Sequence, residues 1–221
     1  MSNMQDTLNQ TAHTKTDYTL YYSQGACSVA TQVVLNELGQ DYQLINVSNV
    51  ENFTDINPVG AVPALVENGI VLTEGAAIIL HLLNKHTNNL LAAEGPVRQQ
   101  GVQDILFANA TMHPAYGRLF FINQYIQDEN AKQEALNNAA TLINTLWQVV
   151  EGKLEKASGD FLGGKQVSAA DIMLSVYSAW GPFFPVDIII GPKTQAMLAN
   201  VQKMPNYQKV VEKEAALANQ A

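Results

Sequence analysis

The hydrophobic pattern of this chain changes once, near residue 88, and that change limits its fold more than any other feature. Between Tyr18 and Asn88, short β-branched and aromatic runs alternate with stretches whose apolar residues recur at helical spacing. After Asn88 no strand pattern of comparable strength appears. The pattern therefore predicts a small α/β domain over 18–88, followed by an all-helical domain over 96–221.

The first of these parts is predicted to contain four strands and two helices. The Asn68-Gly69 pair is the strongest short-range hairpin signal, and Gly39 is a typical residue just beyond a helix end. The strands are expected at 18–22, 42–47, 64–66 and 70–73, and the helices at 28–38 and 75–85.

Five helices are predicted in the second part, and three of them have a proline at or near the start, where its missing N–H costs nothing. They are expected over 96–126, 130–156, 168–180, 192–203 and 205–218. Residues 1–17 are polar and unperiodic, and they lack the apolar segment of a secretory signal. We expect them to form a flexible leader.

Composition narrows the possible partners of the chain. Its 221 residues include 12 basic and 20 acidic side chains, which gives a net charge of −8. An acidic surface repels the phosphates of nucleic acid, so no nucleic-acid partner is expected. No apolar run approaches the roughly 18 residues of a membrane helix, so no membrane partner is expected. Metal ligands at recognisable spacing are absent from the sequence, so no metal is expected either.

Cys27 is the single cysteine, so the chain can form no internal disulfide, which fits a reducing compartment and a cytoplasmic location. It lies directly before the helix predicted at 28–38, and the partial positive charge of a helix N-terminus predicts a lowered thiol pKa. Ala30 lies where a CxxC dithiol would have its second cysteine. The alternative is that Cys27 is simply a small buried apolar residue.

Two side chains near Cys27 each have two interpretations. Ser28 could cap the helix or form a hydrogen bond with a ligand thiol, and capping is the commoner role. Tyr22 could direct its hydroxyl into the turn at 23–25, or it could be a packed aromatic residue of the first strand.

Two backbone segments could bind an extended or anionic ligand. A cis Val62-Pro63 bond would leave the backbone of Val62 free to pair with a peptide, although the residues alone favour the trans form. Glu74 and Gly75 open the helix at 75–85, where backbone N–H groups attract a carboxylate and Glu74 could hold an ammonium group. Glu74 could equally be a residue that only complements the helix dipole.

The helical part contains one candidate site residue and one folding signal. His113 is followed by Pro114, which predicts a kink in the helix there. Ser168 and Asp171 have the spacing of a capping box, which we assign to folding.

Five segments together resemble the cytosolic glutathione S-transferases, most closely the bacterial beta class. They are LYYSQGACSVA (20–30), INPVGAVPAL (56–65), LTEGAAII (72–79), TMHPAYGRLF (111–120) and GKQVSAADIMLSVYSAW (164–180). The resemblance implies a thioredoxin-like α/β domain over 18–88, an all-α helical domain, a homodimer and a role in detoxification.

The resemblance also implies a set of site residues. Val62, before a cis Pro63, would pair with the cysteinyl backbone of glutathione, and Glu74 and Gly75 would bind its γ-glutamyl end. Four residues match catalytic positions around the glutathione sulfur: Cys27, Ser28, His113 and Tyr22. The electrophile pocket would be built from helical-domain side chains, with Phe107, Tyr116 and Trp180 as candidates. Residues 40–57 contain no Lys or Arg to hold the glycine carboxylate of glutathione.

Three functions follow from these observations. The first is transfer of the glutathione thiolate to a small hydrophobic electrophile, with glutathione as co-substrate. The second is glutathione-dependent thiol–disulfide exchange through Cys27. The third is a ligand-binding or partner-binding protein that retains the fold without the activity.

Overall fold

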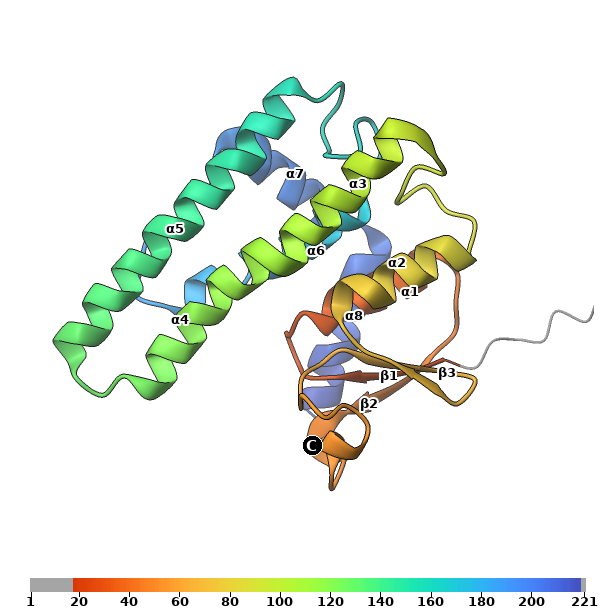
Figure 1. Cartoon of the computed structure of the whole chain (residues 1–221), viewed down its shortest axis with the longest axis horizontal. Coiled ribbons are helices and arrows are strands. Elements are labelled where there is room, and N and C mark those ends of the chain that lie inside the picture. Colours follow the sequence, from red (N-terminus) through yellow and green to blue (C-terminus); the bar gives the residue numbers. More distant parts are fainter. Residues whose placement is uncertain (1–17, 220–221) are drawn as a thin grey trace, which may run out of the picture.

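The computed structural model describes residues 18–219, so the leader predicted over 1–17 lies outside the described residues. Its sheet has the strand order β2-β1-β3-β4, in which β1 is parallel to β2 and antiparallel to β3, and β4 is antiparallel to β3. Helices join this sheet in the thioredoxin-like arrangement (Figure 1). The strands are β1 (Tyr18–Tyr22), β2 (Gln43–Asn46), β3 (Ala64–Glu67) and β4 (Ile70–Leu72).

The local signals of this region are confirmed. Asn68 and Gly69 both have positive φ, at 48° and 85°, which is the backbone geometry of a tight hairpin turn. Gly39 ends the first helix with a φ of 65°. The helices are α1 (Ser28–Glu37) and α2 (Gly75–Lys85), and the irregular link contains short 3₁₀ turns at Val47–Asn49 and Phe53–Asp55.

Helices joined by loops and a 3₁₀ turn at Gly181–Phe183 make up most of the rest of the described chain. Helices α3 and α4 form one long rod beside α5 (Figure 1). The helix predicted over 96–126 is interrupted by a π-helical turn at Ala108–Met112, just before Pro114. The predicted kink is therefore a widened turn, which loosens the backbone where proline has no N–H to donate. The helices are α3 (Gly95–Phe107), α4 (His113–Tyr125), α5 (Glu129–Lys156), α6 (Ala169–Ser178), α7 (Pro192–Gln202) and α8 (Pro205–Ala218).

The core is continuous from the sheet into the helical region. Helix α6 is buried along almost its whole length and packs against both α1 and α7. Helix α8 returns to pack on α1 as well, so α1 lies between the sheet and two helices from the far end of the chain. The domain limits at 88 and 96 stay a prediction. Between residues 18 and 219, no helix has both the length and the apolar character needed to cross a bilayer.

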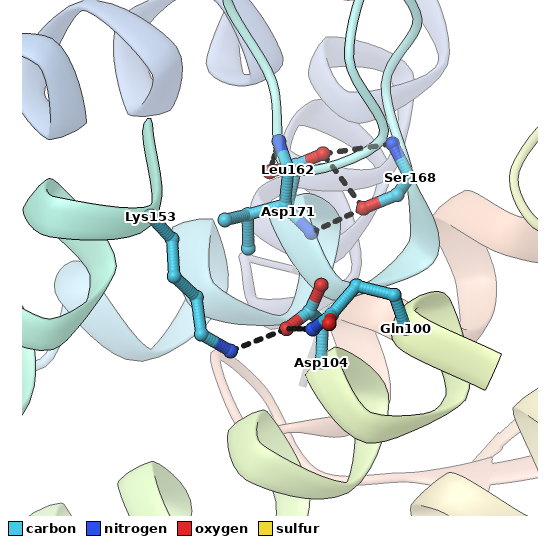
Figure 2. Close-up of polar contacts among 6 residues, drawn as sticks. All are labelled: Gln100, Asp104, Lys153, Leu162, Ser168 and Asp171. Atoms are coloured by element: carbon cyan, nitrogen blue, oxygen red, sulfur yellow. Dashed lines mark hydrogen bonds and ion pairs between the residues drawn. The ribbon is translucent and has the colours of Figure 1, made fainter. Parts of the chain in front are cut away.

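The capping box at the start of α6 is confirmed (Figure 2). Asp171 is fully buried, and its carboxylate accepts hydrogen bonds from the backbone N–H and hydroxyl of Ser168 at 2.8 and 2.7 Å. It also accepts one from the Leu162 N–H at 3.1 Å, so it ties the preceding loop to the helix. Burial raises the pKa of Asp171, and these hydrogen bonds oppose that shift. The carboxylate therefore has a folding role.

We expect Asp171→Ala to lower the free energy of unfolding by about 3 kcal/mol, because three donors, two of them buried, lose their acceptor. For a chain of this size the Tm should fall by roughly 6–12 °C, measured by thermal denaturation. The matched control is Asp187→Ala, since Asp187 is exposed and its loss should change the stability by less than about 0.5 kcal/mol. Equal effects of the two substitutions would contradict the capping role.

Candidate functional site

The turn before α1 is held by two distant parts of the chain. Gly25 has a φ of 65°, and its N–H donates to Glu214 Oε2 of α8 at 2.7 Å. Its carbonyl oxygen accepts a hydrogen bond from Trp180 Nε1 at 2.8 Å, and Trp180 follows α6. Gln32 Nε2 of α1 donates to the other oxygen of Glu214 at 2.5 Å. The position of the turn is therefore set by helices α6 and α8.

Cys27 lies at the end of this turn, in the N-cap position of α1. Its thiol donates to the carbonyl oxygen of Val62 at 3.2 Å. Burial raises the pKa of Cys27 to about 11, although the backbone N–H groups of residues 27 and 28 act in the opposite direction. The prediction of a lowered thiol pKa is therefore wrong, because loss of solvation outweighs the helix terminus. Near pH 7 the thiol is protonated.

Ser28 and Tyr22 do not reach the site in the expected way. Ser28 is fully buried inside α1, and its hydroxyl donates to the Ser23 carbonyl at 3.4 Å. The capping interpretation of Ser28 is wrong, since Cys27 occupies the N-cap position and no side chain caps this helix. Tyr22 is buried at the end of β1, where burial and the nearby charge of Glu214 raise its pKa. Neither side chain lines the cavities described next.

A polar cavity of about 200 Å³ lies beside Cys27. The Val62-Pro63 bond is cis, as the family resemblance implied and contrary to the trans form that the residues alone favoured. Glu74 has a φ of 67°, unusual for a residue with a side chain, and it directly precedes α2. The lining includes Cys27, Val62, Pro63, Glu74, Gly75 and His113.

The structure adds two asparagines to this cavity that were not among the predicted site residues. Asn57 is buried and shapes the loop before Val62, because its amide donates to the Ala61 carbonyl at 2.7 Å. Asn109 lies on the π-helical turn, with Oδ1 only 3.1 Å from where a Cβ on Gly75 would be. The Asn57-Pro58 pair was visible as a turn signal, whereas no local signal could show that Asn109 reaches α2.

An apolar cavity of about 470 Å³ opens on the other side of the same thiol. His113 lines both cavities, and its ring contacts Tyr177 and Trp180 edge to face, with centroid distances of 5.1 and 5.4 Å. Burial lowers the pKa of His113, so its imidazole is neutral at pH 7. Besides Cys27 and His113, the lining includes Gly117, Phe120, Trp180 and Phe183.

Of the three aromatic residues expected in an electrophile pocket, only Trp180 lines this cavity. Tyr116 is fully buried, and its hydroxyl accepts a hydrogen bond from Trp147 Nε1 at 2.9 Å. Phe107 packs beneath the Lys153 ammonium group, 5.2 Å from its ring centroid. The expectation for Tyr116 and Phe107 is corrected, because both residues face the helical core. The other aromatic residues that line the cavity are Phe120 and Phe183.

The arrangement consists of two cavities that meet on a thioredoxin-like fold. The polar cavity is suited to a peptide with charged ends, and the apolar cavity to a second, uncharged compound. The two share one thiol and one neutral imidazole. Among residues 18–219, no three His, Cys, Asp or Glu side chains gather closely enough to hold a metal ion.

Comparison with known proteins agrees with this architecture. Residues 25–90 match the family model "Glutathione S-transferase, N-terminal domain". Glutathione S-transferase GST-4.5 of Xanthomonas campestris is 30% identical over 175 residues, covering 76% of this chain and 85% of the relative. Glutathione S-transferase D7 of Drosophila melanogaster is 28% identical, with 84% of each chain covered. The chain belongs to the glutathione S-transferase family, and it is therefore a transferase.

Solved structures give the same result for the fold. A glutathione S-transferase from Xylella fastidiosa superposes with a TM-score of 0.81 at 27% identity, covering 90% of this chain and 98% of the other. A sphingomonad glutathione S-transferase complexed with glutathione has a TM-score of 0.77 at 27% identity, covering 89% and 98%.

The raised pKa of Cys27 predicts a particular pH dependence of its alkylation. The rate with iodoacetamide should increase about tenfold per pH unit from pH 6.5 to 9.5. At these pH values, which lie below a pKa of about 11, the fraction of thiolate itself increases about tenfold per pH unit. The measurement is the mass of the intact protein over time, with free cysteine as the reference compound. Since Cys27 is the only cysteine, the adducts that Cys27→Ala fails to form under the same conditions report on it. A plateau at or below pH 8 would show that the thiol pKa is not raised.

Proposed function

We propose that this enzyme conjugates glutathione, through its thiolate, to small apolar electrophiles, as a transferase most like the bacterial beta class. The observation that supports this most directly is the meeting of a polar and an apolar cavity at Cys27 and His113. A peptide bound in the first cavity would place its sulfur at the entrance to the second. From the family resemblance, the proposal also includes that the protein is a cytoplasmic homodimer with a role in detoxification.

The polar cavity offers a partner for each group of a γ-glutamyl-cysteinyl peptide. The backbone of Val62 would pair with the cysteinyl residue, as an added strand does at a sheet edge. Glu74 would hold the ammonium group, and the N-terminus of α2 at Gly75 would bind the adjacent carboxylate. The side-chain amide of Asn109, whose Oδ1 lies beside Gly75, would add a neutral hydrogen-bonding group there.

The thiol and the imidazole would then act on the glutathione sulfur. The Cys27 S–H, which now donates to Val62, would turn to the incoming thiolate, and a neutral His113 could donate its N–H to it. The thiolate attacks the electrophilic carbon and forms a C–S bond. With an aryl chloride the C–Cl bond breaks, chloride leaves with its electron pair, and the thiol proton passes to solvent.

The buried state of Cys27 favours conjugation over thiol–disulfide exchange. An attacking cysteine works best with a pKa near the ambient pH, whereas the pKa of Cys27 is about 11.

The absence of Lys and Arg from 40–57 is the feature that favours a non-enzymatic binding role, since it removes a cation for the glycine carboxylate. Calorimetric titration with glutathione tests directly whether the protein binds glutathione. Binding is expected in the millimolar range or tighter, and no binding at millimolar ligand would remove the proposal.

For Cys27→Ala we expect conjugation of 1-chloro-2,4-dinitrobenzene to fall by no more than about tenfold, since one of several donors is lost. Any exchange with oxidised glutathione should disappear, because the only cysteine is gone. Conjugate absorbance and intact mass measure the two reactions. Ser178→Ala is the control, because Ser178 lies at the end of α6 and donates only to the Ser175 carbonyl. Complete loss of conjugation in Cys27→Ala, with the control unchanged, would contradict the role of Cys27 as one of several donors.

A further inference from the structure

A glycine lies on the wall of the apolar cavity, where neither the backbone nor the packing requires one. Gly117 lies inside α4, where its φ is not positive, and an added Cβ would meet no atom within 4 Å. Glycine weakens a helix interior relative to alanine. Gly152 in α5 shares these properties but does not line the cavity. What distinguishes Gly117 is therefore the space that its missing side chain leaves.

That space belongs to one face of α4. His113 precedes Gly117 by four residues and Phe120 follows it by three, so all three project from the same side of the helix. All three also line the apolar cavity, together with Trp180 and Phe183. Gly117 thus leaves a strip of bare helix between an imidazole at the reacting end and a phenyl ring at the other end.

The walls around this strip are aromatic and held in place. Phe120 meets Trp180 edge to face at 5.7 Å and Phe184 at 4.8 Å, with interplanar angles of 82° and 85°. The Trp180 indole is fixed by its hydrogen bond to the Gly25 carbonyl. Phe183 is 67% exposed, so at the cavity it keeps a ring surface free for a ligand. The cavity therefore has a rigid aromatic wall and one open ring.

We propose that Gly117 is a specificity-determining residue, and that its missing side chain keeps open a slot for planar, fused-ring aromatic electrophiles. This inference rests on the proposed conjugation of glutathione. A flat molecule with two fused rings can lie against the bare helix and still reach the aromatic rings, which favour offset or edge-to-face contact. Its reacting carbon then lies at the end of the slot bounded by Cys27 and His113, where the glutathione sulfur arrives. A small aliphatic electrophile needs neither the slot nor the rings.

The test compares two electrophiles in Gly117→Ala and Gly117→Leu. One is 4-chloro-7-nitrobenzofurazan, a fused two-ring aryl chloride, and the other is allyl isothiocyanate, which is small and aliphatic. We expect Gly117→Leu to lower kcat/KM for the two-ring chloride by about tenfold or more, because pocket volume sets this discrimination. The value for the isothiocyanate should stay within about threefold, and the KM for glutathione should not change. Gly117→Ala should have an intermediate effect.

Stability separates this effect from a folding defect. Alanine and leucine are better helix formers than glycine, so both variants should raise the Tm by roughly 2–4 °C. The matched controls, Gly152→Ala and Gly152→Leu, should raise the Tm similarly and change neither activity. A loss of activity in a stabilised protein then reports on the slot.

The outcomes distinguish this inference from the function on which it rests. If the unmodified enzyme converts neither electrophile, the proposed conjugation fails and the slot with it. If it converts the isothiocyanate but not the two-ring chloride, conjugation stands and the slot is wrong. Equal losses for both electrophiles in Gly117→Leu, or no loss for either, would also overturn the role of Gly117.

Discussion

The site depends on one buried carboxylate near the end of the chain. Glu214 accepts hydrogen bonds from the Gly25 N–H and the Gln32 amide, and so links α8 to the turn that ends at Cys27. Burial raises its pKa, and the two donors oppose that shift. Because unpaired buried polar groups are costly, each donor needs this acceptor and the acceptor needs both donors. The turn and the last helix are therefore placed together.

The same turn also connects the two cavities. Its Gly25 carbonyl accepts the indole N–H of Trp180, which forms part of the apolar wall, while Cys27 lines both cavities. The two side chains that line both cavities are neutral: Cys27 is a protonated thiol, and burial lowers the pKa of the His113 imidazole. With a net charge of −8, the protein does not attract an anionic peptide from a distance. In the proposed complex with glutathione, recognition would therefore rest on short-range hydrogen bonds within the polar cavity.

Sequence reasoning succeeded where structure is decided by neighbouring residues. The hairpin at Asn68-Gly69 and the capping box of Ser168 and Asp171 were predictable, because their hydrogen bonds and dihedral angles involve residues a few positions apart. It failed for the pKa of Cys27, because the sign of the shift depends on how much protein covers the sulfur. It also failed for Tyr116, since the sequence shows that an aromatic residue is near His113 but not which way it points.

The sequence by itself determined the kinds of element and their order, the turn that precedes a helix at Cys27, and, through resemblance, the family. Periodicity and caps are local properties, and they survive without knowledge of the fold. Only the tertiary structure decided which side chains share a cavity. Helix α8 reaches Gly25 across 189 residues, and a π-helical turn brings Asn109 over Gly75. The first of these contacts arises from the packing of α8 against α1. Burial, the direction of side chains and the space beside Gly117 are properties of the packed helices, and no local pattern encodes them.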